Sequence, residues 1–204
     1  MAKKRRIGYM PEDRGLYKDL KLEPTLVYLA SLKGMDEKVA RSRLQGWLER
    51  FDLAEHRDKK VQELSRGIQQ KAQIIATLLH NPELIVIDEP FAALDPLNVQ
   101  LVKDVMHELH AQGVTIVMST HQMHLVEELC DRILLISQGR DVLSGSLDEV
   151  RRRFTGHAVL VSAQGNLPAL RGVREILTHN NALKLTLEDH TTPQEVFKAL
   201  AESG

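Results

Sequence analysis

The feature that most constrains the fold is an alternation of short apolar runs with amphipathic stretches between residues 84 and 136. The runs LIVI, VTIVM and RILLI are short and rich in β-branched residues, which is typical of strands covered on both faces. Between them, the residues from Asp95 to Gly113 and a shorter stretch through Leu125 have the spacing of amphipathic helices. This alternation predicts an α/β fold with a parallel sheet and right-handed crossovers.

The residues before these strands predict a helical region from about residue 20 to 80. Pro24 suits a first helical turn, and Gly34 can supply a left-handed C-terminal cap. Asp36 can cap a second helix, which carries apolar residues on one face. We expect this region and a core of about 81–150 to form one domain over residues 1–150.

The tail, residues 151–204, predicts a small C-terminal α+β domain. The residues from His157 to Ser162 are strand-like, and Asn180-Asn181 is a plausible hairpin turn. Leucines then alternate with polar residues from Leu183 to Leu187. The stretch from Thr192 to Glu195 has the pattern of a capping box at the start of a helix.

Composition narrows the class of protein. A formal net charge of −1 over 204 residues offers no electrostatic reason to expect a nucleic-acid partner. The single cysteine, Cys130, excludes an internal disulfide and fits a reducing compartment. No apolar run approaches the roughly 18 residues that span a bilayer, and the start MAKKRRIGYM lacks the apolar region of a secretory signal. We therefore expect a soluble chain in the cytoplasm.

Polar residues follow the expected strands where reactive groups collect in open parallel sheets. Asp88 and Glu89 end the first strand, and His121 follows the second. Two adjacent carboxylates can have different roles, because one can bind Mg²⁺ through water while the other takes a proton from an attacking water. The alternative is that this pair forms only a polar strand end and cap.

A second candidate site lies at Ser65 and Gly67, at the amino-terminal end of an amphipathic helix. Backbone N–H groups and the positive end of the helix dipole favour an anion there, and glycine allows a close approach. The sequence thus predicts a surface that can face a phosphate. The alternative is that Ser65 is only a helix cap.

Four motifs follow one another at close spacing, in the order LSRGIQQK, LIVIDEP, ALDP and MSTHQ. With these motifs, the chain resembles the nucleotide-binding domain of an ATP-binding cassette (ABC) protein. In that family these motifs are the signature, the Walker B strand, the D-loop and the switch histidine. The resemblance implies a fold like that of the P-loop NTPases, with a helical subdomain, and it implies ATP and Mg²⁺ as cofactors. It also implies a second nucleotide-binding subunit and a membrane subunit as partners, at the inner face of the cell membrane.

The resemblance assigns roles to individual residues. Within the signature, Ser65 and Gly67 would contact the γ-phosphate of ATP held by the partner subunit, with Arg66 and Gln69 also facing that nucleotide. Asp88 would support Mg²⁺, Glu89 would polarise the hydrolytic water, and His121 would sense the γ-phosphate. Asp95 would lie across the dimer interface. The full set of expected site residues is therefore Glu12, Ser65, Arg66, Gly67, Gln69, Asp88, Glu89, Asp95 and His121.

The stretch IGYMPEDRGLY refines the resemblance. The family commonly has glutamine where this chain has Glu12, whose carboxylate can bind a cation through water but cannot donate an amide hydrogen bond. Ala92 stands where many relatives carry a serine, so one hydrogen bond across the dimer interface is in doubt. The whole pattern is similar to ATPase subunits of bacterial sodium or multidrug exporters.

The phosphate loop G-x-x-x-x-G-K-[ST] does not occur in the sequence, since none of the 12 glycines is followed by Lys and then Ser or Thr. Phosphoryl transfer depends on the charge stabilisation that this loop supplies. We therefore expect this polypeptide alone to be a poor ATPase whose signature could complete a site in a partner. The alternatives are a non-enzymatic binding or regulatory module and, less in keeping with the absence of heptads, a cassette ATPase of translation or DNA repair.

Overall fold

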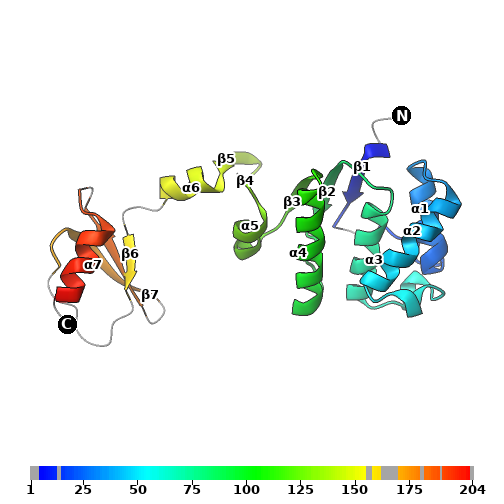
Figure 1. Ribbon diagram of the computed structural model, residues 1–204, viewed down its shortest axis with the longest axis horizontal. Helices are drawn as coiled ribbons and strands as arrows, with labels where there is room; N and C mark the ends of the chain where they lie inside the picture. Colours follow the sequence, from blue (N-terminus) through cyan, green and yellow to red (C-terminus); the bar gives the residue numbers. More distant parts are fainter. Residues whose placement is uncertain are drawn as a thin grey trace. The chain divides into compact units, whose positions relative to one another are not determined.

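The computed structural model describes residues 5–12, 15–154, 158–161, 170–179, 182–188 and 190–202 (Figure 1). The chain divides into two compact units, an N-terminal unit (Met1–Leu129) and a C-terminal unit (Cys130–Gly204). Among the described residues, no helix combines the length and the apolar composition that a bilayer crossing requires. The domain boundary expected near residue 150 stays a prediction.

The helical region of the N-terminal unit contains α1 (Leu22–Leu32), α2 (Glu37–Arg50) and α3 (Arg66–Leu78), with two short 3₁₀ turns before α3 at Ala54–His56 and Val61–Glu63. The expected caps are confirmed. Asp36 accepts hydrogen bonds from the N–H groups of Lys38 and Val39, and Gly34 follows α1 with φ of 86°. The apolar faces of these helices form the largest core of the chain, together with residues from the strands and from α4 and α5.

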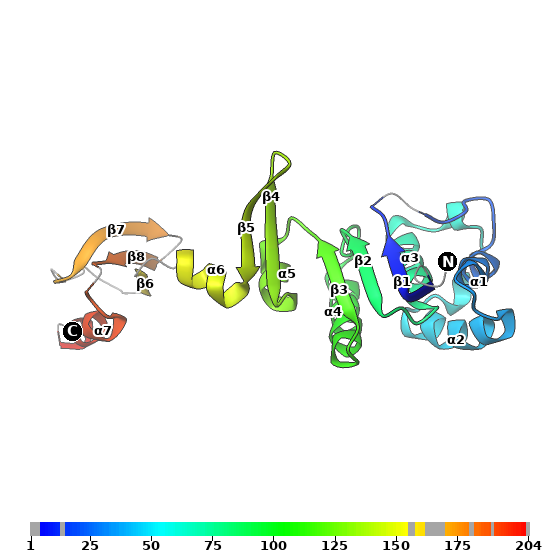
Figure 2. The ribbon, with the colours of Figure 1, turned by 90° about the horizontal axis from the view of Figure 1, so that it is seen from above.

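A parallel sheet completes the N-terminal unit. Its strands are β1 (Ile7–Met10), β2 (Leu84–Asp88) and β3 (Thr115–Ser119), in the order β1-β2-β3. Figure 2 shows the three strands side by side with their carboxyl ends at the same edge. The crossover from β2 to β3 runs through α4 (Pro96–Ala111), and α5 (Met123–Leu129) follows β3. Arg50 of α2 forms a two-point ion pair with Glu108 of α4, at 2.6 and 2.7 Å, which joins the helical region to this layer.

Two expectations about the sheet were wrong. RILLI forms β4 (Arg132–Ser137), which pairs antiparallel with β5 (Arg140–Ser146) instead of joining the parallel sheet. The reason is local, because Gln138 and Gly139 both have positive φ, 51° and 73°, as a two-residue hairpin turn of type I′ requires. The third parallel strand is β1. The other error concerns β3, which is not buried on both faces, since Val117 is 53% exposed.

The C-terminal unit also contains α6 (Leu147–Phe154) and a small antiparallel sheet covered by α7 (Pro193–Glu202). The strand order is β6 (Ala158–Val161), β8 (Ala182–Leu187), β7 (Val173–His179). Leu185 and Leu187 of β8 form its core with Val196 of α7. The expected capping box is confirmed by the bonds between Thr192 and Glu195, whereas the expected turn at Asn180-Asn181 lies outside the described residues.

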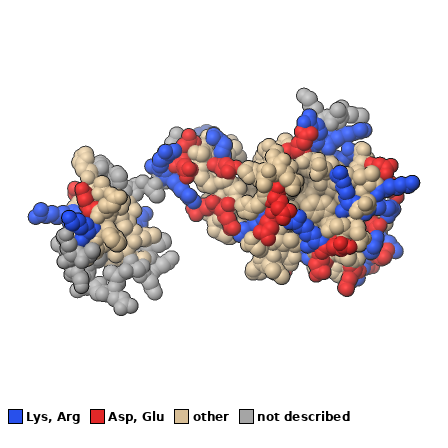
Figure 3. Space-filling model, in the orientation of Figure 1, with Lys and Arg blue, Asp and Glu red and all other residues tan. Residues whose placement is uncertain are grey.

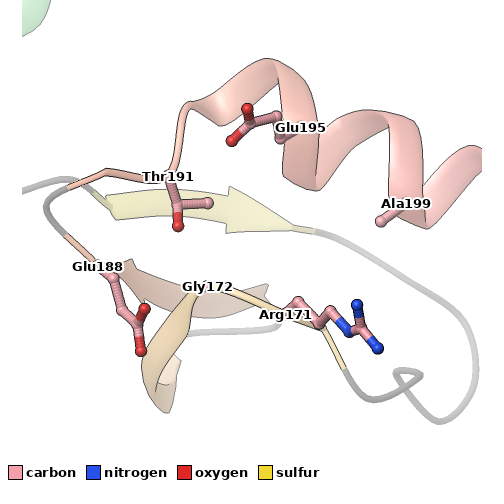
Figure 4. A pocket seen from close by; sticks show the side chains of 6 residues that line it. All are labelled: Arg171, Gly172, Glu188, Thr191, Glu195 and Ala199. Carbon is pink, nitrogen blue, oxygen red and sulfur yellow. The ribbon is translucent and has the colours of Figure 1, made fainter.

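A cavity of about 580 Å³ lies in the C-terminal unit (Figure 4). It is lined by Arg171, Gly172, Glu188, Thr191, Glu195 and Ala199. Glu195 is occupied with capping α7, where it accepts the N–H of Thr192 at 3.0 Å. None of the site residues expected from the sequence lines this cavity, so the candidate site is in the other unit.

Candidate functional site at the carboxyl edge of the sheet

The candidate site is built on the register between β2 and β3. Asp88 and Ser119 are paired at the last position of the two strands. The Ser119 hydroxyl donates a hydrogen bond to Oδ1 of Asp88. Parallel strands therefore bring the carboxylate of Asp88 and the polar end of the next strand together, as the pattern predicted.

Glu89 follows Asp88 and turns the chain sharply, with φ of 44° in the left-handed region. Its backbone N–H donates to the carbonyl of Ser119 at 3.2 Å. Oε1 of Glu89 accepts the backbone N–H of His121 at 3.1 Å and lies 2.8 Å from Nδ1 of the same histidine. Oε2 lies 3.5 Å from the hydroxyl of Thr120. The structure thus brings Glu89 and His121 into direct contact.

The two partners of this contact differ in exposure. The His121 side chain is 82% exposed, whereas the Glu89 side chain is 20% exposed. The carboxylate is therefore mostly covered, whereas the imidazole faces solvent. An acceptor that is fixed in this way can take a proton from a water molecule or share one with the histidine.

The amino end of α3 presents Ser65 and Arg66 to solvent. Ser65 caps the helix, since its hydroxyl accepts the N–H of Ile68 at 3.3 Å. The backbone N–H groups of the first turn have no partners inside a helix, so an anion is favoured at this end. Gly67 packs against the turn after β2, and a Cβ placed there would lie 2.9 Å from the carbonyl oxygen of Ala93.

Three glutamines of α3 make different contacts. The amide of Gln69 is buried and donates to the carbonyls of Val61 and Leu64 at 2.9 and 2.8 Å, so the donors assigned to a nucleotide are engaged within the chain. Gln70 instead reaches the candidate site, where its amide donates to the carbonyls of Glu89 and Pro90. Sequence reasoning missed this residue, and the only signal was its position one turn after Gly67.

Gln73, the third glutamine, donates to the carbonyl of Pro11 at 3.1 Å. This bond fixes the chain just beyond β1, where Glu12 lies with an exposed side chain. Because β1 is parallel to β2, Glu12 is placed at the same edge of the sheet as Asp88. The side chain of Glu12 thus faces solvent at this edge.

Asp95 caps α4, as predicted, with Pro96 in the first turn. Its Oδ1 accepts the backbone N–H of Asn98 at 2.9 Å, and Oδ2 accepts the side-chain amide of the same residue at 2.6 Å. The bond from the Asn98 backbone, followed by that from its side chain, lowers the pKa of Asp95 below its usual value. The exposed carboxylate is therefore ionised near neutral pH and can accept further bonds.

The donor set fits a metal ion that arrives with a nucleotide rather than a metal held by protein alone. Among the residues that the structure describes, no group of three or more His, Cys, Asp or Glu side chains is placed to hold a metal. Mg²⁺ in nucleotide sites is commonly bound by one or two carboxylates together with phosphate oxygens and water. Asp88 at the end of β2 can supply one such carboxylate.

Comparisons with known proteins bear on this arrangement. Residues 32–127 match the family described as "AAA domain, putative AbiEii toxin, Type IV TA system". The chain is 42% identical to the ABC transporter ATP-binding protein YhaQ of Bacillus subtilis, over 98% of this chain and 68% of YhaQ. It is 29% identical to the linearmycin resistance ATP-binding protein LnrL of the same organism, over 98% of this chain and 67% of LnrL.

A solved structure of the ATP-binding subunit of an ABC transporter is also similar. Its TM-score is 0.68 and its identity 36%, and the match covers 74% of this chain and 62% of that subunit. The chain thus spans between 62% and 68% of the length of these three proteins. The matched fold agrees with the parallel sheet and the helices that cover it.

Proposed function

This chain belongs to the family of ABC transporter ATP-binding proteins, and we propose that it acts in ATP hydrolysis coupled to export. The observation that supports the catalytic part of this proposal is the contact between Glu89 and His121 at the edge of the sheet. The direction of transport rests on the resemblance of the motifs to those of bacterial exporters. The cargo would be chosen by a membrane subunit.

Glu89 is the proposed general base. Its carboxylate is held by the backbone N–H of His121 and is mostly covered, so it can orient a water molecule and take its proton. His121 then holds or returns a proton at the same carboxylate through Nδ1. Mg²⁺ bound with ATP would neutralise phosphate charge, and Asp88 is the proposed protein ligand for it, through water.

The exposed end of α3 is the proposed contact with a second subunit. Ser65, Arg66 and the backbone of Gly67 would face the triphosphate that this partner holds, while Asp95 would face the partner's surface. The exposure of Ser65 and Arg66 supports this, because a surface used between subunits must be open in the single chain. The membrane subunit and a location at the inner face of the membrane belong to the same proposal.

In this proposal, the 204 residues form only part of the nucleotide site. These 204 residues contain no phosphate loop motif, so a polypeptide of this sequence needs that loop from another segment or another chain. Without it, the charge on the phosphates is not stabilised and hydrolysis should be slow. On the face shown in Figure 3, acidic and basic side chains are interspersed over the N-terminal unit.

The test compares ATP hydrolysis by the 204-residue chain with that of the same chain extended by an N-terminal segment that carries the motif G-x-x-x-x-G-K-[ST]. Turnover should appear only in the extended form, and Glu89→Gln should then reduce kcat by about 10²- to 10³-fold, a loss typical of a key catalytic group. Glu49→Gln, on the exposed face of α2, is the matched control and should leave turnover unchanged.

Other outcomes contradict the proposal. Absence of turnover in both forms would favour a non-enzymatic binding or regulatory module. Tight, magnesium-dependent binding of ATP by the unextended chain would refute the division of the site between segments.

A further inference from the structure

The turn after β2 has a backbone that must be held in place. Glu89 and Ala93 have φ of 44° and 59°, in the left-handed region that residues with a side chain rarely adopt. This conformation is strained for a residue with a Cβ, and it persists only where the surroundings impose it. Inside the turn, one backbone bond joins the N–H of Ala92 to the carbonyl of Glu89 at 3.1 Å.

Helix α3 supplies the contacts that impose this conformation. Nε2 of Gln70 lies 3.2 Å from the carbonyl oxygen of Glu89 and 3.1 Å from that of Pro90. A glutamine amide has two N–H donors, and these two carbonyls take both. One turn earlier, Gly67 lets the helix approach the carbonyl of Ala93 so closely that a Cβ would lie 2.9 Å from it.

The carbonyl of Glu89 belongs to the same residue whose carboxylate contacts His121. Its position therefore governs the direction in which the side chain leaves the backbone. If the carbonyls of Glu89 and Pro90 lose the amide of Gln70, water can replace the donor, because Gln70 is only half-buried. Water does not impose a direction, so the backbone of Glu89 then keeps only its bonds to Ser119 and Ala92 and is held less firmly in the left-handed region.

We propose that Gln70 is a positioning residue, which holds the turn so that the carboxylate of Glu89 reaches His121. The contact also connects the proposed signature helix to the proposed base of the same chain. This role for Gln70 in catalysis rests on the proposed function of Glu89. The positioning itself does not, and it can be measured without nucleotide.

Gln69 provides a matched control, because it is the adjacent residue and its amide also donates two bonds to backbone carbonyls, those of Val61 and Leu64. In a purely structural account, Gln69→Met and Gln70→Met should have similar effects, since each removes two hydrogen bonds and keeps the length of the side chain. In the positioning account, only Gln70→Met changes the surroundings of His121.

The experiment records the backbone amide proton and the Nδ1 nitrogen of His121 by NMR in the full chain without nucleotide. Glu89→Ala defines the shifts of a histidine that has lost its carboxylate. Gln70→Met should move both signals most of the way to those values, and Gln69→Met should leave them near the wild-type values. The fluorescence of Trp47, the single tryptophan, verifies folding of the N-terminal unit in each variant.

Unchanged His121 signals in Gln70→Met, or equal changes in Gln69→Met, would overturn the proposal. If Gln70→Met does not fold, Gln70→Asn decides the matter, since its amide is one methylene too short to reach both carbonyls and should shift the signals partway.

In the extended, hydrolysing form, Gln70→Met should lower kcat roughly 10- to 100-fold with little change in the KM for ATP. Shifted signals with unchanged kcat would refute the role of Glu89 while leaving the positioning intact.

Discussion

Two helical glycines should respond to alanine with opposite signs. Gly46 lies on the exposed side of α2, and a Cβ there would meet nothing within 4 Å. Gly67 lies in the first turn of α3, where a Cβ would lie 2.9 Å from the carbonyl oxygen of Ala93. Because that oxygen belongs to the backbone of a constrained turn, it cannot move away as a flexible side chain would.

The expected magnitudes follow from these surroundings. Replacing glycine by alanine in a helix stabilises it by about 1 kcal/mol, which is the full effect expected for Gly46→Ala. At Gly67 the same gain is opposed by overpacking, which costs about 1 to 3 kcal/mol. The net effect of Gly67→Ala is therefore a loss of about 1 kcal/mol, and the two variants should differ by about 2 kcal/mol.

Thermal unfolding followed by Trp47 fluorescence measures this difference, because the only tryptophan lies in the N-terminal unit. A difference of about 2 kcal/mol should separate the two melting temperatures by about 4 to 8 °C. Gly67→Ala should also move the NMR signals of His121, since the turn that it displaces contains Glu89. Equal stabilisation by both substitutions would refute the close packing of α3 against the turn.

Two further predictions concern stability. Burial lowers the pKa of His80 below 6.5, so the unfolded state binds more protons than the folded state. The free energy of unfolding should therefore decrease as the pH falls below 6.5 and level off below the lowered pKa. Urea titrations should show a smaller decrease in His80→Gln, and an equal decrease would contradict the assignment to His80. Glu23 is 15% exposed and accepts bonds from Arg41 and Arg57 at 2.6 to 2.8 Å, so Glu23→Ala should cost about 2 kcal/mol, because it removes the carboxylate that bonds Arg57 and one of the two that bond Arg41. Glu37→Ala, which breaks only the exposed bond to Arg41, should cost less than about 0.5 kcal/mol, and equal losses would refute the reasoning.

The features that the sequence predicted well are those decided within a few residues. Asp36, Asp95 and Thr192 cap helices as expected, because a cap requires only a short polar side chain and the backbone of the next turn. The meeting of Asp88 with the end of β3 was also predictable, since the carboxyl ends of parallel strands share one edge.

The features that were missed depend on packing or on an unusual turn. Gln138 is not a typical first residue of a type I′ turn, so the hairpin of β4 and β5 was mistaken for a continuation of the parallel sheet. Gln69 and Gln70 are chemically identical, and which of them faces the site depends on the rotation of α3 about its axis. That rotation is set by contacts along the whole helix. Hydrophobic periodicity identifies the face of the helix that packs, but not the single residue that meets the turn.

The left-handed backbone at Glu89 has a consequence for laboratory evolution. Glycine at this position would relieve the backbone and delete the carboxylate in one step, so under the proposed function the more stable protein would be the inactive one. A screen that selects only for heat resistance should therefore drift toward losing this side chain. Libraries built on this chain need a turnover criterion beside the thermal one.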